Sequence, residues 1–173
     1  MPKVVVIGGG WAGVAAAVRA KKCGAEVTIV EKTDLLLGLG NVGGIMRNNG
    51  RFTAAEENIA LGAGELFEII DKCSIHKNIS FPGHDHADFY DVTMVEPEVR
   101  KLMDKLRIEV RFMDRATDVV KENGELKGVR SASGDVIYGD AFVEATGSAG
   151  PMGNCMRYGN GCSMCILRCP SFG

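Results

Sequence analysis

The stretch Val4–Lys32, VVVIGGGWAGVAAAVRAKKCGAEVTIVEK, decides the fold of this protein. Lys3–Ile7 is a β-branched run without polar alternation, which is typical of a strand buried on both faces. Val14–Cys23 is alanine-rich and helical in character, and it ends before Gly24, a residue that suits a helix C-terminus. A second strand is predicted over Glu26–Val30. Strand, glycine turn, helix and strand together predict a βαβ unit.

Three glycines between the first strand and the helix match the pattern G-x-G-x-x-G. Gly8 permits the tight turn, Gly10 lets the backbone approach a pyrophosphate, and Gly13 lets the helix pack closely on the strand. The helix N-terminus offers free N–H groups and the positive end of its dipole to phosphates. Glu31 follows Gly10 by 21 residues, near the spacing expected for an acid that binds ribose hydroxyls and repels a 2′-phosphate. A dinucleotide site is predicted, with a ligand-free structural turn as the alternative.

Two helices are predicted in the middle of the chain. Thr53–Lys72 opens with a capping box that includes Glu56, and it carries apolar residues at helical spacing. The second helix opens at Glu96 with Pro97 near its first position, and its alternating charges predict a face in solvent. Ser74–Asp91, between the two helices, is predicted to be an irregular surface segment.

The remaining periodic segments predict strands. A strand over Ile108–Met113 precedes three short runs separated by the turn sequences Asn123-Gly124 and Ser133-Gly134-Asp135. These runs predict a β-meander over Thr117–Lys121, Leu126–Ser131 and Val136–Tyr138, followed by a buried strand over Ala141–Ala145. The predicted fold class is α/β: a Rossmann-like FAD/NAD(P)-binding domain with a parallel sheet, flanking helices and a meander inserted before the last parallel strand.

The order of these elements resembles that of a flavoprotein superfamily. Val4–Lys32, the meander and the run VEATG (Val143–Gly147) are similar to the N-terminal part of the glutathione-reductase-like, two-dinucleotide-fold flavoproteins. The loop Gly38–Phe52 is similar in character to that of glucose-inhibited division protein A-type flavoproteins. The resemblance implies the FAD-binding portion of an FAD-dependent oxidoreductase. The alternatives are an NAD(P)-binding domain and a non-catalytic nucleotide- or metal-binding subunit that serves a partner chain.

The resemblance also implies a cofactor site assembled from separate parts of the chain. The glycine turn and the end of the second strand would hold pyrophosphate and ribose, a glycine-rich loop would follow the ribityl chain, the meander backbone would lie beside adenine, and the ATG turn would lie near the pyrophosphate. The residues expected there are Gly8, Gly10, Trp11, Ala12, Gly13, Glu31, Lys32, Gly38, Gly43, Gly44, Asp118, Val119, Ala145, Thr146 and Gly147. No catalytic side chain is identified, since a flavin carries the electrons itself.

The C-terminal residues 151–173 are predicted to form a cysteine-rich tail after a domain at 1–150. The spacing C-x6-C-x2-C-x3-C-P resembles the end of a bacterial ferredoxin run, with Gly159 in place of its first cysteine. Thiolates favour an iron–sulfur cluster or zinc, whereas a redox pair or buried thiols are alternatives. The candidate metal ligands are Cys155, Cys162, Cys165 and Cys169.

Charge and hydropathy restrict the remaining functions. The formal net charge of −2 argues against nucleic-acid binding by this chain alone. The chain has no run of 18 apolar residues and no signal-peptide pattern, so we predict a cytoplasmic protein without a membrane span. The expected partners are FAD and either a second subunit or a missing C-terminal half, and a homo-oligomer is left open.

Overall fold

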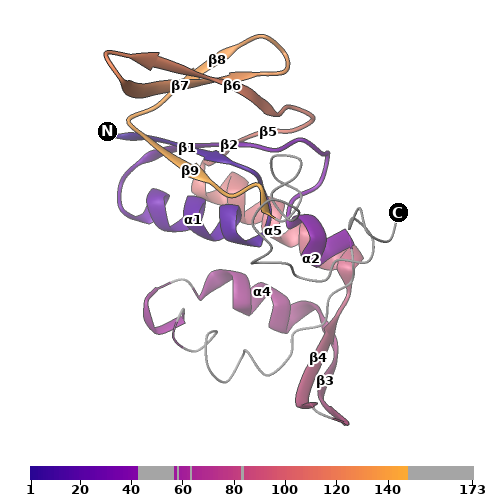
Figure 1. The fold of residues 1–173 in the computed structure, drawn as a ribbon. Helices are drawn as coiled ribbons and strands as arrows, with labels where there is room; N and C mark the ends of the chain where they lie inside the picture. The colour runs from indigo at the N-terminus through magenta and orange to yellow at the C-terminus, as the bar shows by residue number, and fades with distance from the viewer. Residues whose placement is uncertain (43–56, 58, 63, 83, 148–173) are drawn as a thin grey trace.

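A four-stranded parallel sheet forms the centre of the molecule (Figure 1). The computed structural model describes residues 1–42, 57, 59–62, 64–82 and 84–147. The sheet has the order β5-β2-β1-β9, and all its neighbouring strands run parallel. Its strands are β1 (Lys3–Ile7), β2 (Glu26–Val30), β5 (Glu109–Arg111) and β9 (Ala141–Glu144). The predicted α/β class is confirmed, and the carboxyl ends of all four strands share one edge, where ligands of such sheets bind.

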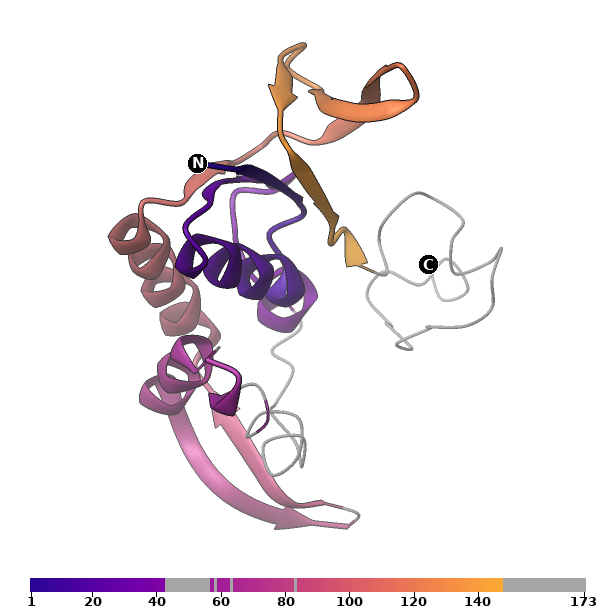
Figure 2. The same cartoon turned by 90° about the vertical axis from the view of Figure 1, so that its left-hand side faces the viewer.

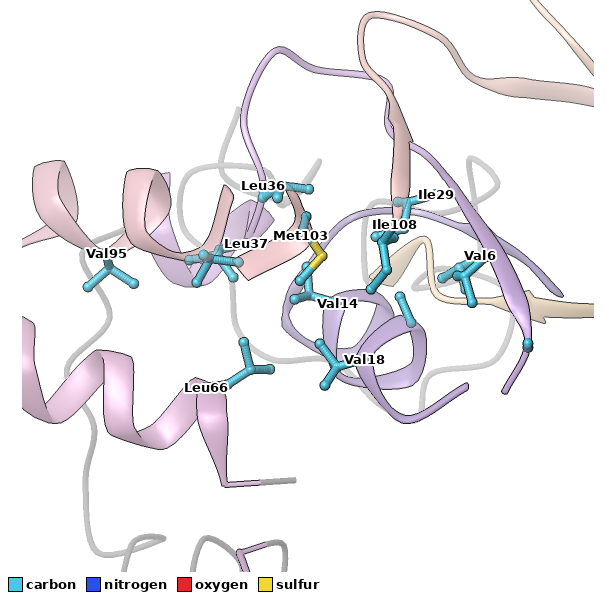
Figure 3. Packing of buried hydrophobic residues seen from close by; sticks show 14 residues of the cluster. Val6, Val14, Val18, Ile29, Leu36, Leu37, Leu66, Val95, Met103 and Ile108 are labelled. Carbon is cyan, nitrogen blue, oxygen red and sulfur yellow. The ribbon is translucent and has the colours of Figure 1, made fainter. Parts of the chain in front are cut away.

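Helices cover one face of the sheet and the meander covers the other (Figure 1). Val6 and Ile29 belong to the core beneath α1 (Trp11–Lys22) and α5 (Val92–Leu106), and Figure 3 shows this cluster. Val5 and Val30 pack instead with residues of β7 and β8. Strands buried on both faces need no polar alternation, as the sequence predicted. The meander comprises β6 (Ala116–Glu122), β7 (Glu125–Ser131) and β8 (Val136–Tyr138).

Helix α1 agrees with its prediction but begins three residues earlier, at Trp11. Gly10 is its N-cap residue, and Gly24 follows the helix with a φ of +88°, a conformation that favours glycine. Its buried side chains, Val14, Ala17 and Val18, all belong to the cluster beneath the sheet.

The region between β2 and α5 differs from the prediction. It contains α2 (Gly38–Val42), α4 (Glu65–Cys73), β3 (Ser74–Phe81) and β4 (His84–Tyr90). The predicted helix Thr53–Lys72 is wrong in its extent, because the chain turns at Gly62 with a φ of +85° before α4 begins. The predicted capping box at residues 53 and 56 lies outside the described residues.

The prediction of an irregular segment over Ser74–Asp91 is also wrong. β3 and β4 form an antiparallel hairpin that extends away from the parallel sheet (Figure 2). Its register shifts at several positions, and Asn78 adopts a φ of +53° while its N–H donates to the Asp88 carboxylate at 2.9 Å. These irregularities remove the two-residue alternation by which a strand is recognised in sequence.

Helix α5 begins at Val92 rather than at Glu96. Asp91 caps it by accepting a hydrogen bond of 2.8 Å from the Thr93 N–H. Pro97 therefore lies inside the helix, where it removes one intrahelical donor. The prediction that the charges of this helix face solvent is wrong for Glu96, which is only 4% exposed.

Candidate cofactor site

The turn between β1 and α1 lies between β2 and the end of β9 and contacts both. The Gly8 N–H donates to the Val30 carbonyl at 2.8 Å. Gly8 has a φ of +101°, and a Cβ added there would lie 2.5 Å from the Ala145 carbonyl oxygen. Conformation and space thus both require glycine at this position. The turn is held between β2 on one side and the end of β9 on the other.

Gly13 is also required by packing against the backbone, whereas a side chain at Gly9 would displace a neighbouring side chain. A Cβ at Gly13 would overlap the Gly8 carbonyl and lie 3.3 Å from the Ala145 Cβ, so α1 approaches β1 as closely as the motif predicts. A Cβ at Gly9 would lie 2.7 Å from the Leu36 side chain.

Gly10 differs from these glycines. Its φ of −67° and ψ of 179° are extended backbone that any residue adopts, and an added Cβ would meet no described atom within 4 Å. Packing within the described part of the chain therefore does not demand glycine there. The space lies at the N-terminus of α1, and no described side chain caps this helix. Free N–H groups beside an open space suit a pyrophosphate.

Glu31 holds the glycine turn through hydrogen bonds, a role that the sequence did not predict. The residue is 6% exposed, and its Oε2 accepts from the Gly9 N–H at 2.7 Å. Its Oε1 accepts from both the N–H and the hydroxyl of Thr33 at 2.8 Å. A carboxylate has about four acceptor positions, so Oε2 retains capacity for a further donor such as a ribose hydroxyl. Glu31 thus holds the glycine turn, and its contact with a ribose stays a prediction.

The loop after β2 returns to the glycine turn. The Leu37 N–H donates to the Gly9 carbonyl at 2.7 Å, and Leu37 forms a bridge with Gly10. A Cβ at Gly38 would lie 3.5 Å from the Gly10 Cα, so the structure brings this predicted residue to the turn. Gly43 and Gly44 lie outside the described residues.

Trp11 packs on α2. A Cβ added to Gly40 would overlap the Trp11 indole, and the same indole borders the core beneath the sheet. Ala12 and Lys32 are exposed near the turn and near the end of β2.

The ATG turn is also brought to the site. The Ala145 N–H donates to the Ile7 carbonyl at 2.8 Å, immediately before Gly8. The Thr146 N–H donates to the Glu144 carboxylate at 2.8 Å. Gly147 has a φ of +70°, and a Cβ there would meet no described atom within 4 Å.

Asp118 and Val119 lie in the meander and are both exposed. The Asp118 carboxylate accepts from the Val119 N–H at 2.8 Å. The segment that bonds directly beside Glu31 comes slightly earlier: the Met113 N–H donates to the Thr33 carbonyl and the Asp114 N–H to the Glu31 carbonyl, both at 3.0 Å. Sequence reasoning missed this segment because no motif marks it.

Asp114 anchors the meander beside this edge. Burial raises the pKa of its carboxyl, but hydrogen bonds from Ser131 and Ser133 outweigh burial and hold that pKa below its usual value. Its Oδ1 also accepts from the Arg115 N–H at 3.0 Å. The carboxylate form therefore stabilises the junction between β5 and the meander.

Two further observations bear on a bound group. Asn41 of α2 is 7% exposed, and its Oδ1 has no hydrogen-bond partner among the residues that the structure describes. Buried acceptors in native proteins are normally satisfied, so this atom suits a donor from a ligand. The open positions at Gly10 and Gly147 and the anion-binding end of α1 likewise fit a dinucleotide.

The predicted metal ligands of the tail, residues 155, 162, 165 and 169, lie outside the described residues and stay a prediction. In the described part of the chain, no group of three His, Cys, Asp or Glu side chains is arranged to hold a metal. None of the described helices is long and apolar enough to cross a membrane.

Solved structures with this fold are larger proteins. GidA from Aquifex aeolicus is 24% identical, with a TM-score of 0.66, over 84% of this chain and 25% of its own. The Diels-Alderase PyrE3 of pyrroindomycin biosynthesis is 19% identical, with a TM-score of 0.61, over 86% of this chain and 33% of its own. A geranylgeranyl bacteriochlorophyll reductase-like protein from Thermoplasma acidophilum is 18% identical, with a TM-score of 0.61, over 84% and 39%. This chain thus spans well under half the length of each.

A family model matches a larger share of the chain than these structures do. The model for glucose inhibited division protein A matches residues 3–173. With the parallel sheet and the glycine turn that follows β1, this match assigns the chain: it belongs to the glucose inhibited division protein A family.

Proposed function

We propose that this chain binds the ADP half of FAD at the carboxyl edge of its parallel sheet, within a protein that works as an FAD-dependent oxidoreductase. The observation that carries the proposal is the contrast among the glycines. A Cβ added at Gly8, Gly9 or Gly13 would lie less than 3.0 Å from a neighbouring atom, whereas a Cβ at Gly10, at the N-terminus of α1, would meet no described atom within 4 Å. A glycine that packing does not require is explained by a ligand that approaches the backbone.

Different residues of the chain would contact different parts of the cofactor. The Gly10 backbone and the first N–H groups of α1 would hold the pyrophosphate, and the Glu31 Oε2 would accept from a ribose hydroxyl. Ala145, Thr146 and Gly147 would lie along the pyrophosphate from the side of β9. The meander backbone near Asp118 and Val119, together with Met113 and Asp114, would border the adenine. When bound, the flavin accepts and donates electrons, while this chain binds and orients the cofactor.

We also propose that the rest of the flavin site comes from polypeptide outside these 173 residues. What supports this is the chain's share of the solved structures with the same fold, which is 25–39%. A second subunit or further sequence would cover the isoalloxazine and bind the substrate. Residues 1–150 would then form the cofactor domain, with the cysteine-rich tail at 151–173 beyond it.

The proposal is tested by titrating FAD into the purified chain and following flavin fluorescence and absorbance. Wild type is expected to bind FAD, and Gly10→Ala and Gly10→Val are expected to weaken binding progressively with an unchanged far-ultraviolet circular dichroism spectrum. Gly64→Ala is the matched control, because Gly64 has a φ of −72° and its added Cβ meets only ordinary contacts, the nearest at 3.6 Å. Equal FAD affinity in wild type and Gly10→Val would refute the site. Binding of NAD without FAD would identify a nicotinamide domain instead.

A further inference from the structure

A buried carboxylate on α5 lies outside the motifs that the cofactor site uses. Glu96 is 4% exposed, and its Oε1 accepts from the Leu36 N–H at 3.1 Å, 60 residues earlier in the chain. The same oxygen accepts from the Arg100 Nε at 3.1 Å and Nη2 at 2.5 Å. Burying a carboxylate is unfavourable unless the group is paired and hydrogen-bonded. A helix that only packed on the sheet would not need a charge at this position.

Arg100 extends this contact to two loops. Its Nη2 donates to the Asp34 carbonyl at 2.7 Å, and its guanidinium carbon lies 4.2 Å from the centre of the Phe112 ring. Asp34 belongs to the loop after β2, and Phe112 belongs to the segment after β5. These two segments flank Glu31 and are bonded to each other through Thr33 and Met113. Glu96 and Arg100 therefore tie both sides of the proposed adenosine position to α5.

The loop that they hold in turn holds the glycine turn. Leu36 is fully buried, and its side chain limits the space at Gly9. The next residue, Leu37, bonds to the Gly9 carbonyl. Figure 3 shows Leu36 and Leu37 in the cluster formed with α5. The contacts are thus continuous from Glu96 through Leu36 and Leu37 to the backbone that faces the open space at Gly10.

We infer that Glu96 and Arg100 are positioning residues for the cofactor: they fix the loop after β2, and through that loop they fix the glycine turn in the geometry that accepts a pyrophosphate. Neither side chain needs to touch the ligand. The inference rests on the proposed function, because it concerns the same site.

An effect of the Glu96 charge and a positioning role of Glu96 predict opposite changes in ligand affinity when this residue is made neutral. Glu96 is negative, so replacing it with a neutral residue would strengthen the binding of an anionic diphosphate if only its charge acted on the ligand. If Glu96 positions the loop, the same replacement weakens binding. The sign of the change therefore separates the two roles.

The test compares Glu96→Gln with Glu98→Gln by isothermal titration with ADP and with FAD. Glu98 is the matched control, since it lies on the same helix with its side chain 38% exposed and forms a surface ion pair with Lys101. Glu96→Gln is expected to weaken ADP binding about tenfold, the equivalent of about 1.4 kcal/mol, and Glu98→Gln is expected to leave it unchanged. Arg100→Lys, which keeps the charge but loses the planar fork, is expected to resemble Glu96→Gln.

Hydrogen exchange at individual amides distinguishes a local loosening of the loop after β2 from a general loss of stability. In Glu96→Gln the Leu36 and Leu37 amides are expected to exchange faster without ligand, and to regain their protection at saturating FAD. If the Glu96→Gln variant is less stable but binds ADP with wild-type affinity, the inference is overturned and the proposed function stands. Wild type that binds neither FAD nor ADP would refute both.

Discussion

Replacing Gly13 with alanine should destabilise the fold, whereas the same change at Gly10 should not. A Cβ at Gly13 would overlap the Gly8 carbonyl and lie 3.0 Å from its carbon, where ordinary carbon contacts are about 3.5–4.0 Å. The same Cβ would lie 1.9 Å from the Gly8 carbonyl oxygen, so helix α1 would have to move away from β1 by about 1 Å. A gap of this size forfeits roughly half of each affected dispersion contact. Val14, Ala17 and Val18 lie on this interface and are fully buried.

Overpacking of this kind costs about 3 kcal/mol at the upper end of its usual range. The higher helix propensity of alanine offsets about 1 kcal/mol. The expected net loss for Gly13→Ala is therefore about 2 kcal/mol. With a slope of about 1–3 kcal/mol per molar urea, the unfolding midpoint should fall by roughly 1 M.

The assay is urea unfolding followed by far-ultraviolet circular dichroism, with FAD titrated into each folded variant. For Gly10→Ala, the lost N-cap preference and the reduced entropy of the unfolded chain nearly cancel, so the free energy of unfolding should stay within about 0.5 kcal/mol of wild type. Gly10→Ala should lose FAD affinity at unchanged stability. A wild-type midpoint for Gly13→Ala would show that α1 and β1 are not in the contact described here.

Three further outcomes are expected. Glu31→Gln should lower the free energy of unfolding by about 1–3 kcal/mol, because Gly9 and Thr33 donate to different oxygens and one donor would then face an NH2 group. Unchanged urea unfolding would contradict the role of Glu31 in holding the glycine turn. The folded-state pKa of Asp114 is depressed, so its contribution is complete above about pH 4 and is lost as the pH falls through the lower folded value. Unfolding followed from pH 6 to 2 should therefore show a smaller loss of stability on acidification in Asp114→Asn than in wild type, and parallel curves would refute this contribution. Anaerobic iron, sulfide and zinc analysis of the full chain should detect a metal if Cys162 and its neighbours bind one, and a metal-free protein would exclude that prediction.

Much of the fold was predictable because its signals are local. The βαβ unit follows from a β-branched run, a glycine turn and an alanine-rich helix, all within the first 31 residues. The meander follows from turn pairs such as Asn123-Gly124, both of which adopt positive φ. The hairpin over residues 74–90 was missed because its irregular register hides the alternation of its strands.

The sequence by itself determined that a glycine turn lies between a buried strand and a helix, with an acid at the end of the next strand. Only the tertiary structure decided that a Cβ at Gly13 would overlap the Gly8 carbonyl while a Cβ at Gly10 would meet no described atom, since both are glycines of one motif. Only the structure decided that Glu96 is buried against Leu36 rather than exposed on a charged helix face. The physical reason is distance along the chain: a residue's local pattern sets its own backbone conformation, but its neighbours in space come from segments as far as 138 residues away, as between Ile7 and Ala145.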